Sequence, residues 1–335
     1  MQAAIYAPEG LALTGDERSF FRDAEPAGFV LFRRNCESNE QMLRLTDSLR
    51  GITGRDDVPV LIDQEGGRVA RMRPPEWPAF PAAEKFANLY RVAPSSAIEA
   101  VRSNARALGL MLRTVGVNVN ALPLLDVRQE GATDIIGDRA LGSEPMQVAA
   151  LGRAVLDGLA SAGVVGIIKH MPGHGRALVD SHKELPVVSA KTADLETDLE
   201  PFERLSTAPI GMTAHVVYTA WDSERPASLS PTVIQDIIRE RIGFDGWLMS
   251  DDIGMEALKG DFASRGAGVV AAGCDVALHC SGKMEEMIAV ASAVPPMSAE
   301  GHERLARAMA GTRIEPDQFD FAEEISKRDH LLALA

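Results

Sequence analysis

The sequence predicts an α/β protein folded as a single (β/α)8 barrel of the TIM type. Short apolar runs, rich in β-branched residues, alternate along the chain with longer segments of helical periodicity. Such runs, without a polar residue at every second position, are typical of parallel strands covered by helices on both faces. The 335 residues would suggest two domains at roughly 150 residues per domain. No linker or change of composition divides them, however, so we expect one domain over residues 1–335.

Eight of these runs are expected to be strands, which is the number that closes a barrel of this kind. They span residues 2–6, 27–32, 58–63, 117–127, 164–170, 210–216, 246–251 and 274–280. Helices are expected at residues 40–50, 97–115, 147–162, 231–241, 263–272 and 283–293, and residues 298–335 are expected to form terminal helices packed on the barrel. An open doubly wound sheet is the competing architecture, but no Gly-x-Gly-x-x-Gly pattern follows the first strand.

Charge and cysteine content narrow the class of protein. There are 34 Lys and Arg against 48 Asp and Glu, a net charge of −14 that opposes contact with nucleic acid or an anionic membrane. The three cysteines, Cys36, Cys274 and Cys280, have no CxxC spacing, which argues against a disulfide framework or a thiolate zinc site. The first residues lack the pattern of a signal peptide, and no apolar stretch approaches the roughly 20 residues of a membrane span. We therefore expect a soluble, cytoplasmic protein.

Ionisable side chains stand at the carboxyl ends of four of the expected strands. These are Asp63, the pair Lys169 and His170, His215, and the pair that begins at Asp251. Active sites of such barrels lie at the carboxyl ends of the strands. Each of these residues alone could simply cap a helix or form an ion pair. Their recurrence on four strands favours a functional site.

The segment at residues 169–183 holds three of the seven histidines around a rigid turn made by Pro172 and two glycines. If the chain is extended further on, Asp180 and His182 point to the same side. Asp180 would then accept a hydrogen bond from one ring nitrogen of His182, raise its pKa and leave the other nitrogen for proton transfer. The alternative is that His182 is an ordinary loop histidine.

The adjacent carboxylates Asp251 and Asp252 are expected to have different roles. Asp251 would lie at the mouth of the barrel, where a carboxylate can act as a nucleophile. Asp252 is expected to cap the next helix, because the following segment, IGMEALK, has helical character.

Together these motifs resemble family 3 glycoside hydrolases, in particular the cytoplasmic β-N-acetylglucosaminidases that recycle peptidoglycan in Gram-negative bacteria. The resemblance rests on KHMPGHG (169–175), DSH (180–182), DQEGGRVAR (63–71) and SDDIGM (250–255), and it extends over residues 29–280. Met171 stands where the family has an aromatic residue. Loss of that flat ring is expected to change the packing near the sugar.

The resemblance implies a retaining mechanism. Asp251 would be the nucleophile that forms a covalent glycosyl intermediate, and His182 would be both proton donor and proton acceptor. Asp180 would orient and tune His182. Most retaining glycosidases use two carboxyl groups, so a histidine in the second role is unusual.

The resemblance also implies which residues hold the terminal N-acetylglucosamine: Asp63, Arg71, Arg139, Lys169 and His170. Without it, Arg139 would be assigned to a surface salt bridge. The implied substrate is a muropeptide fragment with N-acetylglucosamine on 1,6-anhydro-N-acetylmuramic acid, with or without peptide. A monomer that requires no cofactor or metal is expected. His174 and His215 are interpreted as structural residues that hydrogen-bond the loops of the site.

Three alternatives remain open at this point. A metal-dependent barrel hydrolase would use His170, His174, His215 and Asp251 as ligands. A glycoside phosphorylase of the same family would use phosphate in place of water, since a histidine acid/base does not repel the anion. A sugar-binding barrel would have kept the fold and lost the chemistry.

Overall fold

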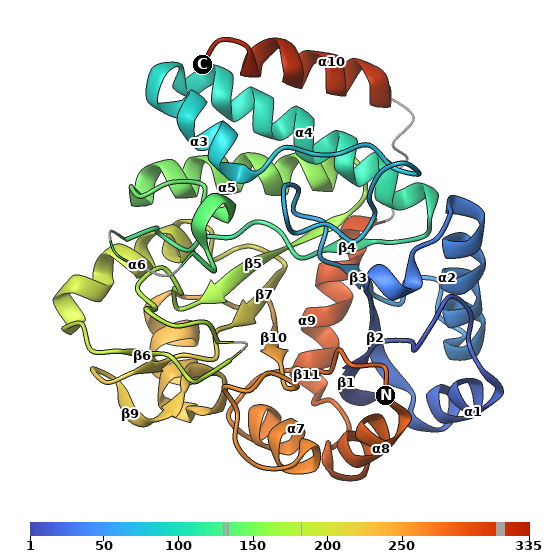
Figure 1. The fold of residues 1–335 in the computed structure, drawn as a ribbon. Helices are drawn as coiled ribbons and strands as arrows, with labels where there is room; N and C mark the ends of the chain where they lie inside the picture. The colour runs from blue at the N-terminus through green and yellow to red at the C-terminus, as the bar shows by residue number, and fades with distance from the viewer. Residues whose placement is uncertain (130, 132–133, 182, 313–318) are drawn as a thin grey trace.

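The computed structural model describes residues 1–129, 131, 134–181, 183–312 and 319–335. Over these residues eight parallel strands close into a barrel, in the order in which they occur along the chain (Figure 1). They are β1 (Gln2–Tyr6), β2 (Pro26–Leu31), β3 (Val60–Ile62), β4 (Val119–Asn120), β5 (Val165–Met171), β7 (Ile210–Thr213), β10 (Trp247–Asp252) and β11 (Val276–Leu278). Because β1 pairs with both β2 and β11, the ring is complete. The predicted α/β barrel is confirmed.

Each barrel strand is followed by a helix that packs outside it, as Figure 1 shows. The helices are α1 (Gly15–Ala24), α2 (Asn39–Thr53), α3 (Ala83–Val92), α4 (Pro94–Thr114), α5 (Pro145–Ser161), α6 (Thr192–Arg204), the π-helix η4 (Val233–Arg241), α7 (Phe262–Ala271) and α8 (Met284–Ala293). Side-chain caps begin α1, α2 and α7. At α1, for example, the Thr14 side chain accepts from the N–H of Glu17 while the Glu17 carboxylate accepts from the N–H of Thr14. No helix in the described ranges is long and apolar enough to cross a bilayer.

Among the barrel strands, the structure departs from the prediction mainly after β4. The run 117–127 was expected to be one strand, but β4 ends at Asn120. Pro123 has no N–H to donate to a ladder, so the chain continues as an irregular segment. That segment still follows β5, because the N–H of Leu125 donates to the carbonyl of Lys169. Helices α1, α3 and α6 were not predicted.

A small sheet, also unpredicted, lies where β5 and β7 end. It consists of β6 (Val187–Val188), β8 (Val217–Tyr218) and β9 (Asp222–Pro226). Strands β6 and β8, of two residues each, are too short to display a period, and β9 has the polar sequence DSERP, which carries no apolar run. The sheet and α6 together flank the loop at residues 172–186, which follows β5 and is called the β5 loop below.

The terminal segment forms α9 (Ala299–Met309) and α10 (Phe321–Leu332). Arg304 of α9 bonds to Asp275 at 3.0 Å and to Asp245 at 3.1 Å, and these two carboxylates precede β11 and β10. Helix α9 therefore lies at the amino end of the barrel, opposite the site described below. Helix α10 packs on α4, where Glu324 pairs with Arg106 at 2.7 Å (Figure 1).

Candidate active site

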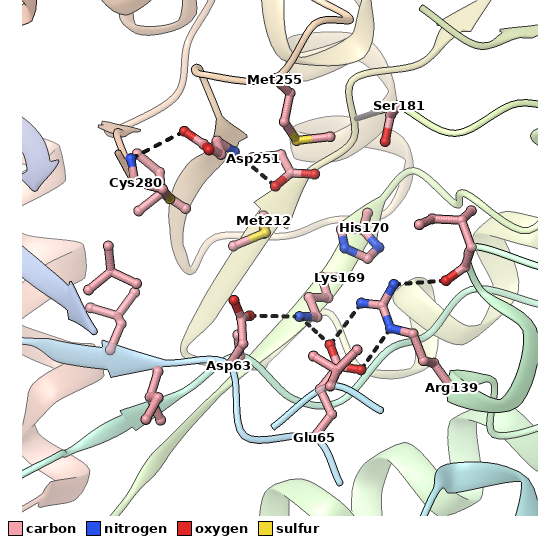
Figure 2. Close-up of a pocket in the computed structure, with 18 of the residues that line it drawn as sticks. Asp63, Glu65, Arg139, Lys169, His170, Ser181, Met212, Asp251, Met255 and Cys280 are labelled. Atoms are coloured by element: carbon pink, nitrogen blue, oxygen red, sulfur yellow. Dashed lines mark hydrogen bonds and ion pairs between the residues drawn. The ribbon is translucent and has the colours of Figure 1, made fainter. Parts of the chain in front are cut away.

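A cavity of about 260 Å³ opens at the carboxyl ends of the barrel strands. Residues from the ends of β2, β3, β5, β10 and β11 line it, so it lies where a barrel of this kind holds its ligand. Five of the predicted site residues, Asp63, Arg71, Arg139, Lys169 and His170, line this cavity together with Asp251 (Figure 2).

One wall of the cavity is a network of alternating charges. Lys169 Nζ lies 3.3 Å from Asp63 Oδ1 and 2.8 Å from Glu65 Oε1. Arg139 binds Glu65 through both Nε and Nη2, each at 2.8 Å. Arg71 Nη2 completes the network at 2.8 Å from Asp63 Oδ2. Figure 2 shows the Lys169 ammonium between the two carboxylates.

The network keeps both of its carboxylates ionised. Burial alone would raise the pKa of Asp63, but Lys169 and Arg71 hold it below its usual range. Burial likewise opposes ionisation of Glu65, and Lys169 and Arg139 outweigh it, so that the pKa of Glu65 is also lowered. Arg139 is therefore part of the cavity wall, and its assignment to a surface salt bridge would have been wrong.

His170 is oriented by Asp126, a residue that the sequence interpretation did not single out. The Asp126 carboxylate is fully buried and lies 2.8 Å from His170 Nδ1. It also accepts from the backbone N–H groups of His170 at 3.2 Å and His174 at 2.7 Å. Burial opposes ionisation of Asp126, yet these partners lower its pKa. Because a carboxylate only accepts, His170 carries its proton on Nδ1 and leaves Nε2 for a ligand.

Asp251 reaches the cavity from the end of β10. Figure 2 shows its carboxylate beside Met255 and Met212, across the cavity from Lys169. One oxygen, Oδ1, accepts from the N–H of Asp252 at 2.8 Å. The predicted position of Asp251 at the barrel mouth is thus confirmed, whereas its role as nucleophile stays a prediction.

Asp252 does not cap a helix, so that prediction is wrong. Its Oδ1 accepts from the N–H of Gly254 at 2.9 Å and of Cys280 at 3.2 Å, which ties β10 to the end of β11. The IGMEALK segment forms turns, and α7 begins later, with Asp261 as its cap. Burial, aided by the charge of Asp251, raises the pKa of Asp252 to about 6.

The DSH motif reaches the cavity through Ser181. This side chain is buried, lines the cavity and lies 3.3 Å from His174 Nε2. His182 lies outside the described residues. Next to it, the carbonyl of Asp180 accepts from the N–H groups of Lys183 and Glu184. The pairing of Asp180 with His182 stays a prediction.

His215 forms the structural hydrogen bonds that were predicted. It is fully buried, with Nδ1 at 2.6 Å from Ser228 Oγ and Nε2 at 2.9 Å from the carbonyl of Asp252. Burial lowers the pKa of His215. Since both ring nitrogens are engaged, His215 does not fit the ligand set of the metal-dependent alternative. In the part of the chain that the structure describes, no cluster of three or more His, Cys, Asp or Glu side chains is placed to hold a metal.

Met171 does not line the cavity, although the exchange was expected to change the packing near the sugar. Met171 is completely buried, and its terminal methyl lies where a Cβ on Gly211 would be, next to the ring of Phe244. The ladder between β5 and β7 shifts register between Ile168 and Met171. Lys169 and His170 both line the cavity, whereas Met171 packs in the layer between strands and helices.

Comparisons with known proteins agree with this geometry. A sequence model described as the glycosyl hydrolase family 3 N terminal domain matches residues 7–309. The chain belongs to glycosyl hydrolase family 3. It is therefore a glycoside hydrolase.

Relatives in family 3 match most of the chain. A β-hexosaminidase of Methylococcus capsulatus is 36% identical over 315 residues, 92% of each chain. One of Bordetella avium is 36% identical over 277 residues, which cover 81% of this chain and 78% of the relative. The structure of NagZ from Neisseria gonorrhoeae in complex with N-trifluoroacetyl-D-glucosamine superimposes with a TM-score of 0.87 at 28% identity, covering 99% of this chain and 98% of that one.

Three residues of the site were missed by sequence reasoning alone: Glu65, Asp126 and Ser181. Glu65 lies two residues after Asp63, and Asp126 ends an apolar run. Both therefore carried the same signal that identified Asp63 and Asp251, a carboxylate just beyond a strand.

Proposed function

We propose that this protein is a retaining exo-β-N-acetylglucosaminidase that removes the nonreducing terminal sugar from muropeptide fragments. The observation that carries the proposal is the Asp251 carboxylate, which faces the network of Asp63, Lys169 and Arg139 across one small cavity. At about 260 Å³ the cavity lies below the roughly 300–1,000 Å³ of pockets for drug-sized ligands. This size suits one sugar ring and hence removal of a terminal residue.

The cavity wall suits a neutral ligand rich in hydroxyl groups. Ionised Asp63 accepts hydrogen bonds from sugar hydroxyls, while Lys169, Arg71 and Arg139 donate to sugar oxygens. His170 offers Nε2 as a further acceptor, because Asp126 holds its Nδ1. Fixed partners on several sides would orient the sugar with its anomeric carbon toward Asp251.

In the proposed mechanism Asp251 attacks the anomeric carbon while His182 protonates the leaving oxygen. The bond to the leaving group breaks and a glycosyl ester of Asp251 forms. Neutral His182, oriented by Asp180, then takes a proton from a water whose oxygen attacks the anomeric carbon. The bond from that carbon to Asp251 breaks, which frees the carboxylate and releases the sugar with retained configuration.

The names of the relatives support an acetamido sugar as substrate. Two are β-hexosaminidases, and the Neisseria protein binds a glucosamine with an acylated nitrogen. The finer assignment, N-acetylglucosamine on 1,6-anhydro-N-acetylmuramic acid with or without peptide, rests on the resemblance. We extend the proposal to a monomer that acts in the cytoplasm.

The first test compares release of 4-nitrophenol from the β-N-acetylglucosaminide and the β-glucoside. We expect turnover of the acetamido sugar only, unaffected by EDTA or phosphate, and its loss in Asp251→Ala. Activity that survives Asp251→Ala would overturn the mechanism. A requirement for phosphate would instead indicate the phosphorylase, and inhibition by EDTA the metal-dependent hydrolase.

A second test addresses the substrate and the stereochemistry. The purified protein is given N-acetylglucosaminyl-1,6-anhydro-N-acetylmuramic acid with and without its peptide, and product anomers are followed by proton NMR. Initial release of the β-anomer supports retention. Initial release of the α-anomer, or no cleavage of either fragment, contradicts the corresponding part of the proposal.

A further inference from the structure

The first half of the β5 loop is attached to three different elements. Tyr218 of β8 donates to the carbonyl of Gly173 at 2.7 Å, and Asp126 accepts from the N–H of His174. The third attachment is to α6, where Arg176 Nε donates to Asp198 Oδ2 at 2.5 Å and Nη2 donates to the carbonyl of Asp194 at 2.8 Å. This last tie is the one that lies nearest to the DSH motif.

Asp198 is an unusual residue for its position. Helix α6 otherwise buries apolar side chains such as Leu195, Leu199 and Phe202. The Asp198 side chain is only 2% exposed, and its Oδ1 has no hydrogen-bond partner in the described part of the chain. Burial raises the pKa of Asp198 to about 6, although Arg176 opposes this.

Stability is a poor explanation for such a group. A buried ion pair is often no better for stability than apolar residues of the same volume, since the charges lose their hydration. The Arg176 side chain is itself about one quarter exposed, so its guanidinium could remain hydrated without Asp198. The pair is better explained by where it places the loop.

Arg176 lies between two residues that line the cavity, His174 and Ser181. Their side chains face the cavity and bond to each other, whereas Arg176 bonds to the helix layer. The loop is thus held from both sides. A shift of the backbone at Arg176 would be passed on to Asp180 and Ser181 within a few residues.

We propose that Arg176 and Asp198 are positioning residues that hold the β5 loop so that its DSH motif meets the bound sugar. This rests on the proposed function, in which His182 of that motif is the proton donor. Neither Arg176 nor Asp198 contacts the substrate, and they act through the loop backbone. Their loss would misplace the proton donor and leave the nucleophile Asp251 on β10 in place.

Such a role has a specific kinetic signature. Protonation of the leaving group matters for methyl β-N-acetylglucosaminide, because methoxide leaves poorly, and matters little for the 4-nitrophenyl glycoside. The kcat/KM of each substrate reports the steps up to departure of its leaving group. For Arg176→Ala we expect kcat/KM to fall roughly tenfold to a hundredfold with the methyl glycoside, in line with the effect of misplacing a group by about 1 Å. With the 4-nitrophenyl glycoside we expect little change.

Companion variants sharpen the test. Asp198→Ala is expected to show the same signature. The double variant is expected to be no worse than Arg176→Ala, because Arg176→Ala already removes the bond to Asp198 as well as the one to the Asp194 carbonyl. Asp198→Asn keeps an oxygen that accepts from Arg176 and should retain most activity. Arg204→Ala is the matched control, since Arg204 lies on the same helix and pairs only with the nearby Glu200 in the described chain, at 2.7 Å.

Equal losses with both substrates, or no loss in Arg176→Ala, would overturn the positioning role. His182→Ala is measured in parallel to separate this outcome from failure of the proposed function. If His182→Ala shows the leaving-group signature and Arg176→Ala does not, only the positioning role is wrong. If His182→Ala loses no more with the methyl glycoside than with the 4-nitrophenyl one, the proposed proton donor itself is wrong.

Discussion

The two ends of the barrel carry ion networks of similar chemistry, one lining an open cavity and the other covered by a helix. At the carboxyl end, Lys169 and Arg139 bind Asp63 and Glu65 around an open cavity. At the amino end, Asp275 binds Arg239 at 2.9 Å and Arg304 at 3.0 Å. Helix α9, which carries Arg304, covers this second network. A cluster of charges alone therefore does not identify a functional site. Whether a ligand can reach the cluster depends on whether another element covers it.

The exposed fraction differs between the networks at Asp63 and Arg71, whereas Lys169 and Glu65, at 3% and 5%, are as buried as Asp275. The side chains of Asp63 and Arg71 keep 23% and 25% of their surface exposed, whereas Asp275 keeps 4%. A ligand can replace solvent at Asp63, but nothing can reach Asp275 without displacing α9. The network at the carboxyl end should thus serve binding and the network at the amino end stability, which single substitutions can test.

The largest effect is expected for Asp275→Ala. It leaves Arg239 and Arg304 without their buried partner and should lower the free energy of unfolding by about 3–5 kcal/mol. Urea unfolding measures this loss, and kcat/KM of the folded fraction should stay unchanged. Arg307→Ala, in an exposed pair with Asp245, is the control and should cost less than about 1 kcal/mol. Loss of activity without loss of stability would break the comparison.

The opposite pattern is expected for Asp63→Ala. We expect kcat/KM to fall by about 10²–10³-fold, since the sugar hydroxyls that Asp63 would bind are left without a hydrogen-bond partner in a buried site. Stability should change by about 1 kcal/mol or less, because Arg71 can reach solvent and Lys169 keeps Glu65. Kinetics with the 4-nitrophenyl substrate and urea unfolding together provide the check. A loss of several kcal/mol with activity retained would contradict the assignment.

A smaller effect is expected for Glu65→Gln. The amide keeps one acceptor but loses the charge that holds Arg139 and Lys169, so KM should rise by roughly tenfold while kcat changes less. Glu84→Gln is the matched control, because Glu84 pairs with Arg128 at 3.3 Å on the exposed surface. An equal effect of the two substitutions would show that Glu65 has no special role in the cavity.

The smallest effect concerns pH and Asp252. Its pKa of about 6 lies above the ordinary value of roughly 3.9, so the folded protein holds an extra proton between these values. The free energy of unfolding therefore falls as pH rises from about 4 to 6. Asp252→Asn keeps the acceptor for Gly254 and Cys280 and should flatten this fall by about 1–2 kcal/mol. Urea unfolding at pH 4.5 and 7 measures it. If the fall in the free energy of unfolding is the same in Asp252→Asn, the raised pKa of Asp252 is contradicted. We attribute the part of the fall that remains in this variant to Asp198, whose pKa is also raised.

Sequence patterns predicted the barrel and about half of its site. Strand ends indicated Asp63, Lys169, His170 and Asp251, because the position of a residue just beyond an apolar run follows from local sequence. Arg139 came only from the family resemblance. Its partner Glu65 is 74 residues away, and no local pattern indicates which distant carboxylate an arginine will bind.

The errors share one physical origin. Asp252 was expected to cap a helix in the segment that follows it, but it accepts there from Gly254 in a turn and also from Cys280, just beyond the neighbouring strand β11. Met171 was expected near the sugar, but a register shift turns it into the helix layer. In both cases the outcome depends on how two strands are aligned, which the apolar periodicity of either strand does not specify.

The pairing of β1 with β11 has a consequence for how the protein is made. These two strands form the seam of the barrel, and nearly the whole sequence separates them. Until β11 leaves the ribosome, β1 is an unpaired edge that can join another strand or another chain. Asp251, the proposed nucleophile, lies on β10, the barrel strand before β11, so the site is not closed until β11 has been made. Chaperone protection of the nascent chain would matter most during that interval.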